Sequence, residues 1–139
     1  MQDILSQYLR EAAMQESFTR NSPENSGSEG TLTAVERIEA YLRSSPMVLF
    51  MKGSPDFPQC GFSAQVVNAL RGCRATFTHV NILEDPELRQ TLKTYSNWPT
   101  FPQLYIHGEL IGGYDIVMDM YRSGDLSRMV KRAGAVLTE

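Results

Sequence analysis

The feature that most constrains the fold is a short apolar run in the middle of the chain. Residues 47–51, Met-Val-Leu-Phe-Met, are the longest unbroken apolar stretch of the 139-residue sequence. Five residues are too few to cross a bilayer, and Pro46 and Gly53 leave no room for a core helix. The run therefore predicts a short buried strand, with the rest of one modest domain packed around it.

The segments on either side alternate between helical and strand patterns. We expect helices at residues 34–44, 61–71, from 86, 115–123 and from 125, and strands at 47–51, 76–80, 103–106 and 109–111. Gly72 is expected to close the second helix, and His107-Gly108 to form a two-residue hairpin turn. This order predicts an α/β thioredoxin fold, in which an N-terminal helix precedes a βαβ unit and a ββα unit that share a mixed four-stranded sheet flanked by helices.

The first thirty residues differ in composition from the rest. Residues 21–30 use only five residue types and contain no apolar side chain, which predicts a flexible linker. Ahead of it, residues 4–12 carry apolar side chains at helical spacing, which indicates either a transient helix or a docking segment. We therefore predict an acidic extension at 1–30 and a folded domain at 31–139.

Charge and cysteine content exclude several classes of protein. Residues 1–30 carry a net charge of −3, whereas residues 31–139 are neutral, with eleven basic and eleven acidic side chains. No basic surface for nucleic acid and no basic leader segment is expected, so the sequence predicts a cytoplasmic protein that binds neither nucleic acid nor membrane. Two cysteines, Cys60 and Cys73, are too few for a disulfide scaffold or a zinc site within one chain.

Cys60 is the strongest candidate for chemistry. It lies between the buried strand and the start of a helix, where unpaired N–H groups and the helix dipole stabilise a thiolate. Lys52 adds a positive charge at the end of the strand. The alternative is an inert buried cysteine. A dithiol enzyme would carry its second cysteine at position 63, but Ser63 stands there, so an external thiol or Cys73 would have to release any disulfide that Cys60 forms.

Two further segments predict a ligand beside Cys60. A cis bond before Pro102 would leave the backbone of the preceding residue free to pair with an extended peptide, and the Phe101 ring is expected to cover the apolar part of that peptide. The turn at residues 112–115 presents amides that suit a carboxylate. With Arg89 available for a second carboxylate, the pattern suggests a small ligand that bears two carboxylates and a thiol.

Four motifs then point to a known family. They are Lys-Gly-Ser-Pro at 52–55, Pro-Gln-Cys-Gly-Phe-Ser at 58–63, Trp-Pro-Thr-Phe-Pro-Gln at 98–103 and Gly-Gly-Tyr-Asp at 112–115. In this order and spacing, across roughly residues 33–132, the sequence resembles the monothiol glutaredoxins of the CGFS type. The resemblance implies a thioredoxin fold, glutathione as ligand, and a [2Fe–2S] cluster at the interface of a homodimer. It also implies a role in iron–sulfur cluster storage and transfer and in iron homeostasis, with BolA-type proteins and recipient apoproteins as partners.

The resemblance also assigns roles to individual residues. It makes Cys60 both the reactive thiol and the cluster ligand. It assigns glutathione contacts to Lys52 and Arg89, to the backbone of Phe101 before Pro102, and to the backbone amides at positions 114 and 115, which are Tyr114 and Asp115 here. Tyr114 departs from the family, which usually has cysteine at that position, and the extension at residues 1–30 lies outside the family core.

Counting ligands supports the cluster interpretation. A [2Fe–2S] centre takes four thiolates, and one chain offers a single exposed candidate, Cys60. Two chains and two glutathione molecules would supply all four. Two alternatives remain open: a glutathione-dependent disulfide oxidoreductase with Cys60 as nucleophile, and a metal-free adaptor that docks partners through its N-terminal segment.

Overall fold

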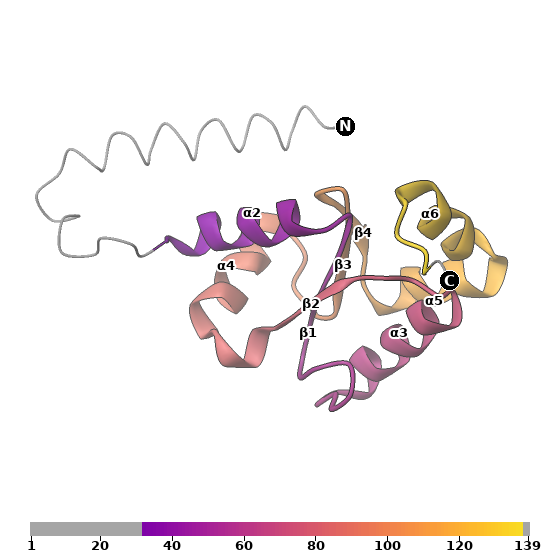
Figure 1. The fold of residues 1–139 in the computed structure, drawn as a ribbon. Coiled ribbons are helices and arrows are strands. Elements are labelled where there is room, and N and C mark those ends of the chain that lie inside the picture. The colour runs from indigo at the N-terminus through magenta and orange to yellow at the C-terminus, as the bar shows by residue number, and fades with distance from the viewer. Residues whose placement is uncertain (1–31, 138–139) are drawn as a thin grey trace, which may run out of the picture.

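A computed structural model describes residues 32–137, which form a four-stranded sheet between two layers of helices (Figure 1). The strand order is β2-β1-β3-β4. Strand β1 pairs in parallel with β2 and antiparallel with β3, and β3 pairs antiparallel with β4. This mixed sheet confirms the expected βαβ and ββα units. The predicted boundary at residue 31 and the segment before it lie outside the described residues.

The elements follow one another as the sequence predicts, with small shifts at their ends. They are α2 (Ala34–Ser44), β1 (Met47–Met51), α3 (Gly61–Gly72), β2 (Thr78–Asn81), the 3-10 turn η2 (Ile82–Glu84), α4 (Pro86–Ser96), β3 (Gln103–Ile106), β4 (Glu109–Gly112), α5 (Tyr114–Ser123) and α6 (Asp125–Ala133). In the described part of the chain, no helix is both long and apolar enough to cross a membrane.

Local signals explain most of these boundaries. Thr33 and Glu36 form a reciprocal capping box that starts α2, and Asp85 caps α4 ahead of Pro86. At the hairpin, His107 and Gly108 have φ values of +49° and +80°, as a two-residue turn of the primed type requires.

Two predictions about the segment between α3 and β2 were wrong. Gly72 does not cap α3, because it is still helical and the positive φ falls on Arg74, at +58°. Strand β2 starts at Thr78 rather than at residue 76, because Thr76 instead donates its N–H to the carbonyl of Ala135 near the C-terminus. A contact between distant parts of the chain therefore overrides the local alternation.

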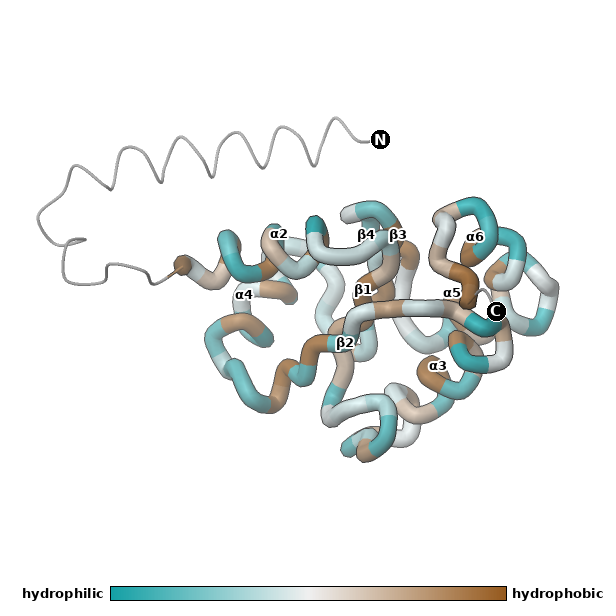
Figure 2. The backbone as a smooth tube through the Cα atoms, in the orientation of Figure 1, coloured by the Kyte–Doolittle hydropathy of each residue, from teal (hydrophilic) through white to brown (hydrophobic). Residues whose placement is uncertain are grey.

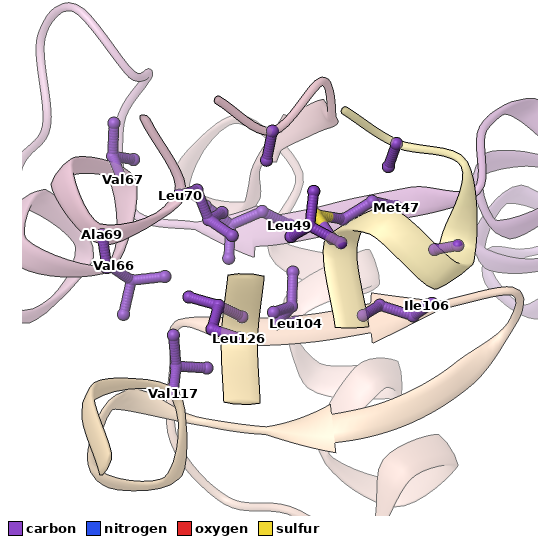
Figure 3. Packing of buried hydrophobic residues seen from close by; sticks show 14 of the residues in the cluster. Met47, Leu49, Val66, Val67, Ala69, Leu70, Leu104, Ile106, Val117 and Leu126 are labelled. Atoms are coloured by element: carbon purple, nitrogen blue, oxygen red, sulfur yellow. The ribbon is translucent and has the colours of Figure 1, made fainter. Parts of the chain in front are cut away.

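The sheet separates two apolar clusters. One lies under α3, α5 and α6, and Figure 3 shows side chains from these helices meeting those of β1 and β3, among them Leu70, Leu104 and Leu126. The other lies under α2 and α4 and includes Phe50 and Leu92. All five residues of β1 have 0% exposure, which confirms the predicted buried strand. In Figure 2 this strand is brown at the centre of the molecule, whereas many outer helical turns are teal.

Candidate functional site

The loop between β1 and α3 fixes the position of Cys60. Gly53 has φ +90°, and a Cβ atom there would lie 2.5 Å from the carbonyl oxygen of Phe57, so only glycine fits. Gln59 donates its N–H to the carbonyl of Lys52 at 2.9 Å, which closes the loop. Cys60 follows as the N-cap residue of α3, in extended conformation. Its sulfur therefore stands at the start of the helix, as predicted.

The surroundings of Cys60 favour its thiolate. Partial burial opposes ionisation, but hydrogen bonds from the N–H groups of Ser63 and Phe62 outweigh it, with help from the charge of Lys52 and the hydroxyl of Ser63. Together they lower the pKa of the Cys60 thiol below its usual value. This environment does not fit an inert buried cysteine.

Ser63 has a role that sequence reasoning missed. Its side chain is fully buried, and its hydroxyl accepts a hydrogen bond from the N–H of Lys52 at 3.2 Å. The same hydroxyl contributes to the lowered pKa of Cys60. Ser63 therefore ties the end of β1 to the first turn of α3, in addition to lacking the thiol of a dithiol enzyme.

The other cysteine lies far from this site. Cys73 is the C-cap residue of α3, so the twelve-residue helix separates it from Cys60 by about 20 Å along the axis. A disulfide between the two within one folded chain is therefore excluded. Burial raises the pKa of the Cys73 thiol, and the side chain packs against the apolar cluster under α3. Cys73 is therefore a partly buried packing residue at the edge of this cluster.

The segment before β3 borders the site from the sheet. The peptide bond between Phe101 and Pro102 is cis, as predicted. Phe101 is only 6% exposed and packs into the cluster under α2 and α4, so little of its ring is available to cover a ligand, although the residue lines the groove. Its contribution to the site comes from the backbone, because the side chain is used by the core.

A buried amide supports this segment, and sequence reasoning missed it. Gln103 has 0% exposure, and its Nε2 donates to the carbonyl oxygens of Trp98 and Thr100 at 3.0 and 3.3 Å. The hydroxyl of Tyr105 donates to its Oε1 at 3.2 Å. The Gln103 side chain is buried, so the segment is held from inside the molecule.

The N-terminus of α5 faces Cys60 from the other direction. Gly113 is its N-cap residue, and a Cβ atom at this position would lie 2.9 Å from Nε1 of Trp98 and 3.2 Å from the carbonyl oxygen of Pro102. Glycine therefore lets α5 approach the cis-proline segment closely. The N–H groups of Tyr114 and Asp115 lie in the first turn, where no intrahelical acceptor exists. Such a helix end attracts an anion.

These segments enclose a groove of about 580 Å³. Its lining comprises Lys52, Cys60, Phe62, Arg89, Lys93, Trp98, Pro99, Thr100, Phe101, Gly113, Tyr114, Asp115 and Ile116. Every predicted site residue is among them. A charged contributor was missed: Lys93, which lies one turn beyond Arg89 on α4. A cationic residue at that spacing was visible in the sequence, but only the packing of α4 shows that it reaches the groove.

Electrostatically, the groove suits an anionic ligand. Lys52, Arg89 and Lys93 supply three positive charges against the single negative charge of Asp115. None of the three cations forms an ion pair or a side-chain hydrogen bond with another residue in the described part of the chain. Among residues 32–137 there is also no group of three or more His, Cys, Asp or Glu side chains able to hold a metal ion. Any cluster bound through Cys60 therefore needs ligands from elsewhere.

Comparison with known proteins agrees with this geometry. The glutaredoxin family profile matches residues 47–111. Glutaredoxin 4 of Escherichia coli is 50% identical over 103 residues, which cover 74% of this chain and 90% of that protein. This chain belongs to the glutaredoxin family. Monothiol glutaredoxin-S17 of Arabidopsis thaliana is 56% identical over 100 residues, 72% of this chain and 20% of that longer protein.

A solved structure extends the likeness to three dimensions. The crystal structure of a buckwheat glutaredoxin–glutathione complex superposes with a TM-score of 0.67 at 25% identity, covering 75% of this chain and 93% of that chain. Together with Ser63 in the CGFS motif, these relatives identify the chain as a glutaredoxin of the monothiol type with a thioredoxin fold.

Proposed function

We propose that this glutaredoxin binds glutathione in the groove and, as a homodimer, carries a [2Fe–2S] cluster as cargo for storage and transfer. The observation that carries the proposal is an activated thiol, Cys60, that opens into a cationic groove with no second thiol in reach. Such a thiolate suits metal coordination and poorly suits dithiol turnover, because no local cysteine resolves a mixed disulfide.

The groove offers a partner for each charged part of glutathione. Arg89 and Lys93 stand on consecutive turns of α4 and suit the glycyl carboxylate, while Lys52 lies near the thiol. The backbone of Phe101 suits strand-like pairing with the cysteinyl unit of the peptide. The amides of Tyr114 and Asp115 suit the γ-glutamyl carboxylate. That another glutaredoxin binds glutathione supports this placement.

The number of thiolate ligands that a [2Fe–2S] cluster takes is the reason for proposing a homodimer. A [2Fe–2S] cluster takes four thiolates, and each chain supplies one through Cys60. Two bound glutathione molecules supply the remaining two, so cluster, glutathione and second subunit would be held together or lost together. We further propose BolA-type proteins and iron–sulfur recipient apoproteins as partners, the cytoplasm as the site of action, and iron homeostasis as the process served.

The lowered pKa of Cys60 favours a second candidate, a glutathione-dependent disulfide oxidoreductase. The Cys60 thiolate would attack the glutathionyl sulfur of a protein–glutathione disulfide, release the protein thiolate and become glutathionylated. A glutathione thiolate would then attack that mixed disulfide, regenerate Cys60 and leave oxidised glutathione. Cys60 reduces the substrate disulfide in the first step and glutathione reduces Cys60 in the second, so no second cysteine is required.

One reconstitution experiment separates the two. The full-length protein is purified without oxygen, supplied with glutathione, iron and sulfide, and examined by visible absorption and by its mass in solution. We expect a brown dimer, and a colourless monomer after Cys60→Ser or when glutathione is omitted. Cys73→Ser is the matched control and should remain a brown dimer, because Cys73 lies outside the groove.

The opposite result is equally clear. A colourless wild-type protein that rapidly reduces a glutathionylated substrate would overturn cluster carriage and establish the oxidoreductase. Deletion of residues 1–30 provides a separate test of the adaptor alternative: partner binding that survives the deletion would exclude a docking role for that segment.

A further inference from the structure

Tyr114 joins α5 to α3 next to Cys60. Its ring packs on the ring of Phe62 at a centroid distance of 4.7 Å and an interplanar angle of 52°. Its hydroxyl donates to Oε1 of Gln65 at 3.1 Å. Phe62 and Gln65 lie one turn apart on the same face of α3, so Tyr114 is held at two points.

This aromatic pair borders Cys60 directly. Phe62 is two residues from Cys60, and its N–H is one of the donors that stabilise the thiolate. Both rings line the groove into which the sulfur opens. Phe62 is 56% exposed, and Tyr114 is half-buried against the cluster under α3. The pair is therefore anchored at Tyr114 and exposed at Phe62, in the same groove as the sulfur.

Gly61, between Cys60 and Phe62, adds nothing to this obstacle. A Cβ atom at Gly61 would meet nothing within 4 Å apart from its chain neighbours. The Phe62 and Tyr114 rings are therefore the bulky groups that α3 and α5 place in the groove beside Cys60. A small or slender reagent passes such an obstacle, whereas a bulky one collides with it.

We propose that Tyr114, together with Phe62, forms an aromatic wall that makes Cys60 selective for small or slender thiol and disulfide ligands and excludes bulky ones from the α5 side. Tyr114 is a specificity determinant through its side chain, while its backbone amide keeps the separate role proposed above. The inference rests on the proposed reactivity of the Cys60 thiolate, but not on glutathione binding or on cluster assembly.

The test compares two reagents that consume the same thiolate. Iodoacetamide is small: a carbon–sulfur bond forms and iodide leaves. Ellman's disulfide is bulky and aromatic: the thiolate attacks one sulfur, the S–S bond breaks and one nitrothiobenzoate anion is released. Because both rates depend on the thiolate population, their ratio is insensitive to a change in the pKa of Cys60. The full-length protein is treated with a chelator beforehand and carries Cys73→Ser, so that only Cys60 reacts.

We expect Tyr114→Ala to raise the rate with Ellman's disulfide about tenfold relative to the rate with iodoacetamide, equivalent to about 1.4 kcal/mol of steric hindrance removed. Tyr114→Phe keeps the ring and should change the ratio less than twofold. Phe62→Ala removes the other ring of the wall and should also raise the ratio. Two variants on different helices keep the test decisive if one of them folds poorly.

A matched control lies on the same helix. Tyr121 is a second tyrosine of α5, exposed at 41%, and its hydroxyl lies against Gly72 at the far end of α3. Tyr121→Ala therefore removes an aromatic contact between the same two helices without touching the wall, and the ratio should stay at its wild-type value.

An unchanged or lowered ratio in both Tyr114→Ala and Phe62→Ala would overturn the wall. An equal rise in Tyr121→Ala would also overturn it, because general loosening of α5 would then explain the effect. The ratio is read from the metal-free protein, so failure of cluster assembly leaves this test intact. Conversely, if the wild-type protein forms a brown dimer but the ratio is unchanged in Tyr114→Ala and Phe62→Ala, only the aromatic wall is refuted and the proposed function stands.

Discussion

Two hollows of similar size flank the loop from Gly53 to Gln59, and only one has the properties of a binding site. The groove at Cys60 measures about 580 Å³, and the hollow on the other side, which we call the β2 hollow, about 500 Å³. The β2 hollow is lined by Tyr41, Gly53, Ser54, Phe57, Gln59, His79, Val80, Asn81, Glu84, Asp85 and Leu88. Volume alone does not distinguish the two.

What distinguishes them is how their polar groups are used. In the β2 hollow, Oδ1 of Asn81 accepts from the N–H groups of Gly53 and Leu83, and Asp85 caps α4 while it pairs with Arg37. These groups stabilise the fold and are not available to a ligand. In the groove, three cations and the first amides of α5 lack such partners within the described residues. Unpartnered cations and helix amides, rather than empty space, therefore mark the candidate site.

The largest expected effect comes from the loop between Lys52 and Cys60, which lines the β2 hollow and ends at the groove. Gly53→Ala forces a side chain into a positive φ and against the carbonyl of Phe57, so we expect the free energy of unfolding to fall by about 3 kcal/mol or more. Chemical denaturation measures it. Gly61→Ala, whose added methyl meets open space, should stay within about 1 kcal/mol of wild type. Equal losses in the two variants would show that the loop is not sterically fixed.

The next effect tests the cations of the groove. Arg89→Ala combined with Lys93→Ala should weaken glutathione binding roughly 10- to 100-fold, because charged hydrogen bonds to a carboxylate are lost. Isothermal titration calorimetry measures the affinity. Arg37→Ala removes a cation that pairs with Asp85 beside the β2 hollow, and it should leave glutathione affinity unchanged while it lowers stability. If Arg37→Ala also weakened glutathione binding, the effect would not be specific to the cations of the groove, and the distinction between the two hollows would fail.

A third prediction concerns Glu39, a buried acid that, unlike Asp85, lacks a partner for one of its carboxylate oxygens. Glu39 of α2 is 4% exposed, its Oε2 has no hydrogen-bond partner, and burial, opposed by Arg43, raises its pKa from 4.5 to about 7. The folded protein thus holds a proton that the unfolded chain releases, so the free energy of unfolding falls as the pH rises from about 4.5 to about 7.

Replacement of this acid should remove the pH dependence. Glu39→Gln should be about 1–3 kcal/mol more stable than wild type above pH 7, and similar to it at pH 4. Thermal unfolding across this pH range measures the difference. Glu109→Gln, at an exposed position on β4, should follow the wild-type profile. If the stability of Glu39→Gln changed with pH in the same way as that of wild type, Glu39 would not have a raised pKa in the folded protein.

The smallest effect concerns Ser63. Ser63→Ala removes a hydroxyl that favours the thiolate, so the pKa of Cys60 should rise toward its ordinary value. Ultraviolet titration of the thiolate in the Cys73→Ser background measures this. Ser54→Ala, in the β2 hollow, should leave the titration unchanged. A pKa that does not move in Ser63→Ala would assign the activation of Cys60 to the backbone donors and Lys52 alone.

Much of the site was predictable because its signals are local. The position of Cys60 follows from a strand, a loop fixed by glycine and proline, and a helix start. The turn before α5 follows from two adjacent glycines in the same way. Lys93 and Gln103 were missed because neither has a local signal: one looks like a solvated lysine and the other like an ordinary strand residue. Their roles arise only where α4 and β3 meet the groove.

The sequence by itself determined the order of the elements, the buried β1 strand, the cis-proline segment and a single thiol at a helix start, because caps, periodicity and turn residues act over a few neighbouring positions. The tertiary structure alone decided which polar groups stay free. In the folded protein the Phe101 ring packs into the core, the Ser63 hydroxyl interacts with the N–H of Lys52 and with Cys60, and the Tyr114 ring packs on Phe62. Burial and hydrogen-bond partners depend on residues far apart in the chain, so no local pattern encodes them.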